Sequence, residues 1–214
     1  MGQKIHPIGF RMGETATWES RWFGDKKKYR QFVVEDIKIR ELLMKKLKGA
    51  GVTKVEIERA SNRLKVLIFV ARPGVLIGRG GTGLSELKKF LMQELNIKEE
   101  SALEIAPMDI KAPDLSAYLV AQSAAEQLIK RLPAQRVMNQ ILDRVMRAGA
   151  KGVRIVLAGR IGGAEIARRE WKATGTMPLH TIRQDIDFAS VPALTKSGYV
   201  GVKVWINRGE AIES

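Results

Sequence analysis

Residues 75 to 83 form a glycine-rich segment that reads Val-Leu-Ile-Gly-Arg-Gly-Gly-Thr-Gly, and it narrows the possible folds of this chain more than any other segment. Glycines placed this densely let a backbone turn sharply and approach a phosphate closely. From Gly78 to Gly83 the segment satisfies G-x-G-x-x-G, a pattern of dinucleotide-binding enzymes. From Gly78 to Gly81 it satisfies G-x-x-G, a pattern of loops that grip an RNA backbone. The two patterns predict different folds on either side.

The neighbouring residues argue against the dinucleotide-binding interpretation. In that fold the first glycine follows its strand almost at once, because the strand delivers the pyrophosphate to a helix N-terminus. Here the predicted strand 63–70 is separated from Gly78 by residues 71–77, where Pro73 can start a helical turn. The strands predicted at 53–59 and 63–70 also form a hairpin, whereas that fold begins with parallel strands. We therefore expect no nucleotide cofactor and no enzyme activity.

The G-x-x-G pattern stands in the context that an RNA-binding loop needs. Asp36 to Gly49 has helical periodicity, the hairpin follows, and the loop lies between a short helix at 73–77 and a helix from Thr82 onward. A strand at 103–107 completes the order α-β-β-α-α-β, which resembles the type II form of the KH fold, a small RNA-binding module. The remaining interpretation is a tight turn alone, for which three glycines in four residues carry a high entropic cost.

Charge points to the same class of partner. The net charge is +14, and each half of the chain, 1–110 and 111–214, carries an excess of seven positive charges. A chain this basic usually neutralises nucleic-acid phosphates. The sequence contains no cysteine, no apolar run of membrane length and no signal-peptide pattern. We expect a cytoplasmic protein that binds RNA and no metal, membrane or small-molecule substrate.

The C-terminal half predicts a second domain that begins near Ala112-Pro113-Asp114, because a residue before proline is pushed out of the helical region. Two helices in tandem, interrupted at Pro133, precede strand-like stretches near 152–158, 165–173, 183–188 and 199–206. The predicted fold class is α+β, with two helices packed on a mainly antiparallel sheet of about four strands. The expected domains are an extended N-terminal arm over 1–35, the KH domain over 36–110 and the C-terminal domain over 111–214.

Five segments resemble one family. They are Met1-Gly2-Gln3-Lys4-Ile5-His6-Pro7, Ala71-Arg72-Pro73-Gly74-Val75-Leu76-Ile77-Gly78, Gly162-Gly163-Ala164-Glu165-Ile166-Ala167-Arg168, Pro178-Leu179-His180-Thr181 and Gly201-Val202-Lys203-Val204-Trp205-Ile206. Together they resemble the bacterial small-subunit ribosomal protein S-three family, and the resemblance spans nearly all of the chain.

The resemblance implies a structural, non-enzymatic protein of the small ribosomal subunit. It implies binding to small-subunit rRNA in the head, contact with ribosomal proteins S-ten and S-fourteen, and a place where mRNA enters. In relatives a basic cluster early in the second C-terminal helix grips mRNA. The matching stretch here, Gln135 to Asn139, keeps only the charge of Arg136, with Arg131 close by. That departure argues against strong RNA unwinding. The alternative function is a free-standing KH regulator or chaperone, which needs the glycine loop but not the C-terminal half.

The candidate site residues fall into three groups. The RNA-binding loop is Gly78, Arg79, Gly80 and Gly81, and the mRNA candidates are Arg131 and Arg136. The basic residues expected to contact RNA are Lys4, His6, Arg72, Lys88, Lys89, Lys151, Arg154, Arg160, Arg168, Arg169, Lys172 and Arg183. Some of them are expected only to be solvated. Trp171 and Trp205 are expected to pack or to contact partners rather than to stack on bases.

Overall fold

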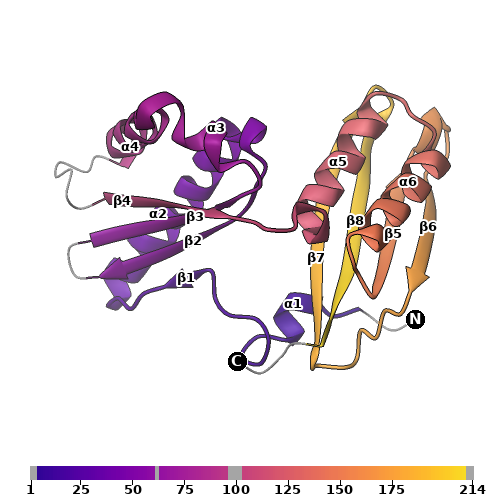
Figure 1. Ribbon diagram of the computed structural model, residues 1–214, viewed down its shortest axis with the longest axis horizontal. Coiled ribbons are helices and arrows are strands. Elements are labelled where there is room, and N and C mark those ends of the chain that lie inside the picture. The colour runs from indigo at the N-terminus through magenta and orange to yellow at the C-terminus, as the bar shows by residue number, and fades with distance from the viewer. Residues whose placement is uncertain (1–3, 61–62, 96–102, 211–214) are drawn as a thin grey trace. The chain divides into compact units, whose positions relative to one another are not determined.

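The structure is a computed structural model that describes residues 4–60, 63–95 and 103–210 (Figure 1). The chain forms two compact units. Trp18–Lys111 is one, and the residues up to Thr17 together with those from Ala112 onward are the other. Each unit has its own sheet and its own hydrophobic core.

The first unit has the order that the glycine loop predicts. Its helices are α2 (Lys26–Lys46), α3 (Pro73–Ile77) and α4 (Thr82–Leu95), and its sheet has the order β1-β2-β3-β4. These strands are β1 (Ser20–Arg21), β2 (Val52–Ala60), β3 (Arg63–Val70) and β4 (Leu103–Asp109). β2 and β3 form an antiparallel hairpin, whereas β3 and β4 are parallel, and α3 and α4 supply the crossover connection that a parallel pair needs. Alternate residues of β3 from Leu64 to Val70 are buried, so one face of the sheet packs against the helices. The predicted α-β-β-α-α-β order is confirmed, and β1 is an addition.

The start of α2 corrects two expectations. The helix begins at Lys26, ten residues before Asp36, so residues 26–35 are helical rather than an extended arm. Asp36 is not an N-cap but a buried residue inside the helix. Its carboxylate accepts hydrogen bonds from Ser20 Oγ at 2.8 Å, Trp22 Nε1 at 2.8 Å and Arg59 Nη2 at 2.6 Å and Nε at 3.1 Å. This network ties β1 and the residues after it to α2 and β2.

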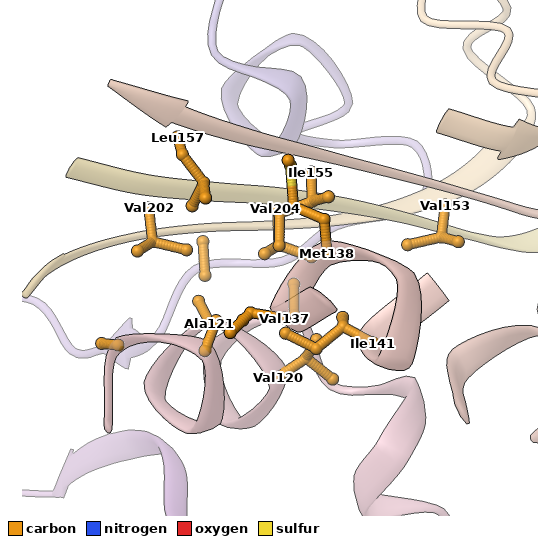
Figure 2. Close-up of a cluster of buried hydrophobic side chains, with 14 of the residues drawn as sticks. Val120, Ala121, Val137, Met138, Ile141, Val153, Ile155, Leu157, Val202 and Val204 are labelled. Carbon is orange, nitrogen blue, oxygen red and sulfur yellow. The ribbon is translucent and has the colours of Figure 1, made fainter. Parts of the chain in front are cut away.

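The second unit confirms the predicted two helices on an antiparallel sheet. The helices are α5 (Ala117–Ile129) and α6 (Ala134–Arg147), and the strand order is β6-β5-β8-β7. The strands are β5 (Gly152–Gly159), β6 (Arg168–Gly175), β7 (Gln184–Thr195) and β8 (Gly198–Glu210). Figure 2 shows the core, in which helix residues face the alternate residues of β5 and β8 that point toward them. The labelled residues are Val120, Ala121, Val137, Met138, Ile141, Val153, Ile155, Leu157, Val202 and Val204.

The first described residues belong to this second unit and are not extended throughout. They form a short helix, α1 (Pro7–Phe10), capped by His6, whose Nδ1 accepts a hydrogen bond from the Gly9 N–H at 3.3 Å. The His6 ring meets the Phe188 ring edge to face, with centroids 5.0 Å apart. Phe188 points away from the helices, because its neighbour Ala189 is part of the helix-facing core. The N-terminal segment therefore lies on the sheet face opposite α5 and α6.

Arg11 fastens this segment. The residue is 1% exposed, and its guanidinium donates hydrogen bonds only to backbone carbonyls. Nε reaches Gln184 O at 2.7 Å and Nη2 reaches Thr181 O at 2.8 Å and Leu179 O at 3.2 Å. Burial lowers the pKa of Arg11, and the nearby Asp185 carboxylate opposes that shift. These carbonyls belong to the loop before β7 and to its first residue, so one side chain holds two distant segments together.

Candidate nucleic-acid interface

The glycines of the loop have two different structural roles. A Cβ on Gly78 would lie 2.9 Å from Gly83 N, and a Cβ on Gly83 would lie 2.7 Å from Leu76 O. These two glycines therefore allow α3 and α4 to meet closely. Gly80 and Gly81 have φ of 63° and 80°, and a Cβ added to either would meet no atom within 4 Å. They need glycine for their backbone conformation alone. Gly80 is exposed and Gly81 is half-buried, and the open space beside both leaves room for another chain to approach.

The basic residues around this loop are placed unevenly. Arg72 is exposed directly before α3, Lys89 is exposed on α4, and Lys88 is half-buried. The side chain of Arg79 lies outside the described part of the structure. The first turn of α4 carries no acidic side chain, so its N-terminal N–H groups face no competing carboxylate from that turn. This arrangement can accept a phosphate backbone.

The predicted basic residues of the C-terminal unit divide between the two faces of its sheet. Arg168 and Lys172 lie on the helix-covered side, where Arg168 pairs with Glu170 at 2.9 Å and Lys172 Nζ donates to Asn139 Oδ1 at 2.7 Å. Arg154 and Arg169 point to the opposite side. This division follows from strand alternation once the register is known.

The remaining members of the list are peripheral to these strands. Lys151 and Arg183 are exposed, and Arg160 Nε donates to Ala164 O at 2.8 Å, which closes its own glycine turn. Lys4 comes close to Arg154 and Arg169. Burial first, and then these two cations, lower the pKa of Lys4. Lys203 is not among the basic residues predicted from the sequence. It is exposed on the same sheet face as Arg154 and Arg169, and its alternation with the buried Val202 and Val204 could have indicated this position.

The two mRNA candidates lie at the α5–α6 connection. Arg136 is exposed on α6, and Arg131 directly follows the C-cap of α5. Arg131 is the only described non-glycine residue with positive φ, at 63°. Its N–H donates to Leu128 O at 2.9 Å and the Leu132 N–H donates to Gln127 O at 3.2 Å, which is a Schellman motif. Glycine is the usual residue at that position, so an arginine there is held against its own preference.

The neutral residues at the expected basic cluster have partners on β6. Gln135 Nε2 donates to Glu170 Oε2 at 3.0 Å, and Asn139 accepts from Lys172. Lys172 thus brings a positive charge beside α6 at a point where the helix itself has none.

Within the described residues no cluster of three or more histidine, cysteine or acidic residues could hold a metal ion. In the same part of the chain, no helix is both long and apolar enough to cross a membrane.

Comparison with known proteins decides between the two glycine patterns. The KH domain profile matches residues 38–115, and the profile described as "Ribosomal protein S3, C-terminal domain" matches residues 124–206. "Small ribosomal subunit protein uS3" of Desulfatibacillum aliphaticivorans is 47% identical over 214 residues, which cover 100% of this chain and 96% of that protein. The chain belongs to the ribosomal protein S3 family. The uS3 proteins of Lactobacillus helveticus and Desulfitobacterium hafniense are 49% and 50% identical, over 99% of this chain and 92% and 94% of theirs.

Membership of the S3 family confirms the resemblance carried by the five sequence segments. The KH match includes the whole Gly78–Gly81 loop, so the loop belongs to an RNA-binding module rather than to a dinucleotide-binding fold. Members of the S3 family are structural ribosomal proteins, and both domains of the family are present in this chain.

Proposed function

We propose that this chain is a structural, non-enzymatic constituent of the small ribosomal subunit, bound to small-subunit rRNA in the head, on cytoplasmic ribosomes. The full-length similarity to proteins named uS3 carries this proposal. The net charge of +14, shared by both halves of the chain, supports extensive phosphate contact. The C-terminal match over 124–206 argues against a free-standing KH regulator, which would not need that domain. Ribosomal proteins S-ten and S-fourteen are the neighbours that the family resemblance implies.

Within this function, Gly78, Arg79, Gly80 and Gly81 would contact an RNA backbone. The open space beside Gly80 and Gly81 supports that role, and Arg72, Lys88 and Lys89 are available to adjacent phosphates. The boundaries proposed for the two domains, 36–110 and 111–214, place the loop in the first and most of the basic residues of the list in the second.

We further propose that Arg131 and Arg136 face mRNA where it enters the subunit. The unfavourable backbone conformation of Arg131 supports this role, because strained residues are retained most often where function needs them. Lys172, held beside Asn139, adds a third positive charge near this helix. Arg131, Arg136 and Lys172 together carry less positive charge than a run of basic residues on α6 would carry. This smaller charge fits mRNA binding better than strong unwinding.

Sedimentation tests the central proposal. A tagged copy of the chain expressed in growing cells is expected to co-sediment with the small subunit and to be released at high salt. Each phosphate contact to a single strand adds about 0.7 to the slope of log affinity against log salt. A chain that sediments mostly as free protein would contradict the ribosomal assignment. Replacement of Gly80 by Asp tests the loop separately, since it should weaken binding of single-stranded RNA without unfolding the protein.

A further inference from the structure

The C-terminal sheet has one face that α5 and α6 do not cover. Strand alternation and pairing register identify the residues that point to it. Part of this face is filled by a small apolar cluster of Val156, Ile186 and Trp205, with Phe188 and the N-terminal segment beside it. The rest, formed by β6, β5 and β8, carries Trp171, Arg154, Arg169 and Lys203. We call this second region the open face.

Trp171 is the exposed aromatic residue of the open face. It is 58% exposed, whereas Trp205 is 7% exposed and belongs to the apolar cluster. The Arg154 guanidinium lies over the Trp171 ring with Cζ 5.1 Å from its centroid, and 5.8 Å from that of Trp205. The cation restrains the indole from one side. A restrained, exposed indole is a surface on which a planar group can stack, which is contrary to the role that the sequence led us to expect for Trp171.

The charge around Trp171 is positive and uncompensated. Val156 pairs with Trp171 on one side and with Lys203 on the other, so these two residues are two strand spacings apart, roughly 10 Å. Arg169 is the next residue along β6 that points the same way, and Lys4 lies close to it and to Arg154. Lys203, Arg169 and Lys4 are exposed.

Carboxylates are missing from this region. The outward positions of β5, β6 and β8 from Arg154 to Ala158, Arg169 to Ala173 and Gly201 to Trp205 include no acidic residue. Within the described residues Arg154 has no ion-pair partner, and its buried Nε has no hydrogen-bond acceptor. Four cations gathered around a ring without counter-charges create a positive potential that attracts an anionic ligand.

We propose that the open face binds an unpaired strand of small-subunit rRNA, with one base stacked on Trp171 and adjacent phosphates paired with Arg154, Arg169, Lys203 and Lys4. Single-stranded RNA presents bases and phosphates side by side. Proteins bind such a strand with aromatic rings that stack on its bases and nearby cations that pair with its phosphates, which is the combination found on the open face. An acidic peptide would use the cations but not the ring face. mRNA is the less fitting source, since Arg136 and Lys172 lie on the helix-covered side of the sheet. The inference rests on the proposed ribosomal function, which it extends to a second, base-stacking contact.

Binding measurements on the full chain test the stacking contact. The background carries Gly80→Asp so that the KH loop contributes little, and the probes are octa-adenylate and inorganic polyphosphate, which has charge but no bases. Trp171→Ala is expected to weaken octa-adenylate binding roughly 5- to 150-fold. It should leave polyphosphate binding within about twofold, because it removes no charge. Trp171→Phe should retain most of the affinity, and Trp18→Ala, which removes a tryptophan 70% exposed in the other unit, should change neither probe.

Two results in solution would overturn the proposal. One is an unchanged affinity of the Trp171→Ala variant for octa-adenylate. The other is an equal loss for both probes, which would show that charge or folding rather than stacking had changed. Thermal unfolding of each variant separates folding from binding.

Chemical probing of assembled subunits tests the source of the strand. With Trp171→Ala, one or a few unpaired rRNA bases should become more reactive in subunits free of mRNA, and Trp171→Phe should restore their protection. A change seen only when mRNA is bound would assign the strand to mRNA and overturn the rRNA proposal. Unchanged reactivity, or a crosslink from position 171 to a neighbouring protein, would also overturn it. A chain that never enters subunits would refute the ribosomal function instead, independently of the oligonucleotide result.

Discussion

Replacing Arg11 with alanine should release the N-terminal segment from the C-terminal unit. The buried guanidinium donates to carbonyls at Pro7, Leu179, Thr181 and Gln184, over distances of 2.7 to 3.2 Å. Two of these carbonyls, Leu179 and Thr181, lie in the loop before β7, and a third belongs to Gln184, the first residue of β7. After the substitution they would be buried without a donor unless the segment moved away and admitted water.

The magnitude follows from three independent long-range bonds. Nη2 has only two hydrogens, so its longer contact of 3.5 Å to Pro178 O adds little. A hydrogen bond to a charged group contributes roughly 1.5 to 3 kcal/mol. The alanine variant loses these hydrogen bonds, but it also no longer bears the cost of burying the guanidinium, which cancels part of the loss. We expect a net loss of about 2 to 4 kcal/mol, capped by the free energy that docks the segment.

Urea unfolding and limited proteolysis measure this loss. Chymotrypsin should cut after Phe10 much faster in Arg11→Ala than in the unsubstituted chain, because local opening exposes the short helix. Arg11→Lys should recover only part of the stability, since an ammonium cannot spread its donors over separated carbonyls. Arg183→Ala is the matched control, because Arg183 is exposed in the same loop. Unchanged stability and unchanged cleavage in Arg11→Ala would refute the role assigned to this residue.

Four further predictions concern single residues. Asp36→Ala should destabilise the chain to urea by about 3 kcal/mol, because it leaves the largely buried guanidinium of Arg59 without its main partner; a loss below about 1 kcal/mol would contradict the network. Gly83→Ala should cost more stability than Gly80→Ala, since the first adds a backbone clash and the second only an unfavourable φ of roughly 1 kcal/mol; equal costs in thermal unfolding would contradict the two roles. Arg131→Gly should stabilise the fold by up to about 1 kcal/mol while weakening mRNA binding, so a destabilised variant would count against backbone strain. Burial raises the pKa of the Tyr118 phenol above its ordinary 10.0. The contribution of the neutral phenol to the free energy of unfolding is therefore complete below pH 10.0 and is lost as the pH rises through the folded-state pKa. Tyr118→Phe should remove this part of the loss of stability at alkaline pH, which denaturant titrations at several pH values measure.

Local patterns predicted the elements of both units well. The hairpin and the glycine loop could be predicted from the sequence, because strand alternation, Pro73 and the glycines act over only a few residues. The start of α2 was misplaced because Asp36 has the chemistry of an N-cap, and its burial depends on Arg59 from β2. A side chain suited to a helix end was instead a charge partner inside the helix.

The candidate site was predicted as a list of basic residues, without its geometry. The list could not show that Arg154 and Arg169 point to one face of the sheet and Lys172 to the other, because this depends on the register of β5 and β6. Nor could it show which tryptophan is exposed. Trp171 and Trp205 are both aromatic residues in strands, and only the packing of Ile186 and Phe188 buries the second.

The elements, the KH loop and the basic character of the chain could be predicted from short stretches of sequence, because they depend on periodicity, glycine spacing and charge within those stretches. The assignment of the N-terminal segment to the C-terminal unit depends on tertiary contacts such as the bond from Arg11 to Gln184, which join residues 173 positions apart. Tertiary contacts also determine which cations gather around Trp171. Such contacts leave no local pattern, because each depends on two segments whose spacing in sequence is arbitrary and whose meeting requires the whole fold.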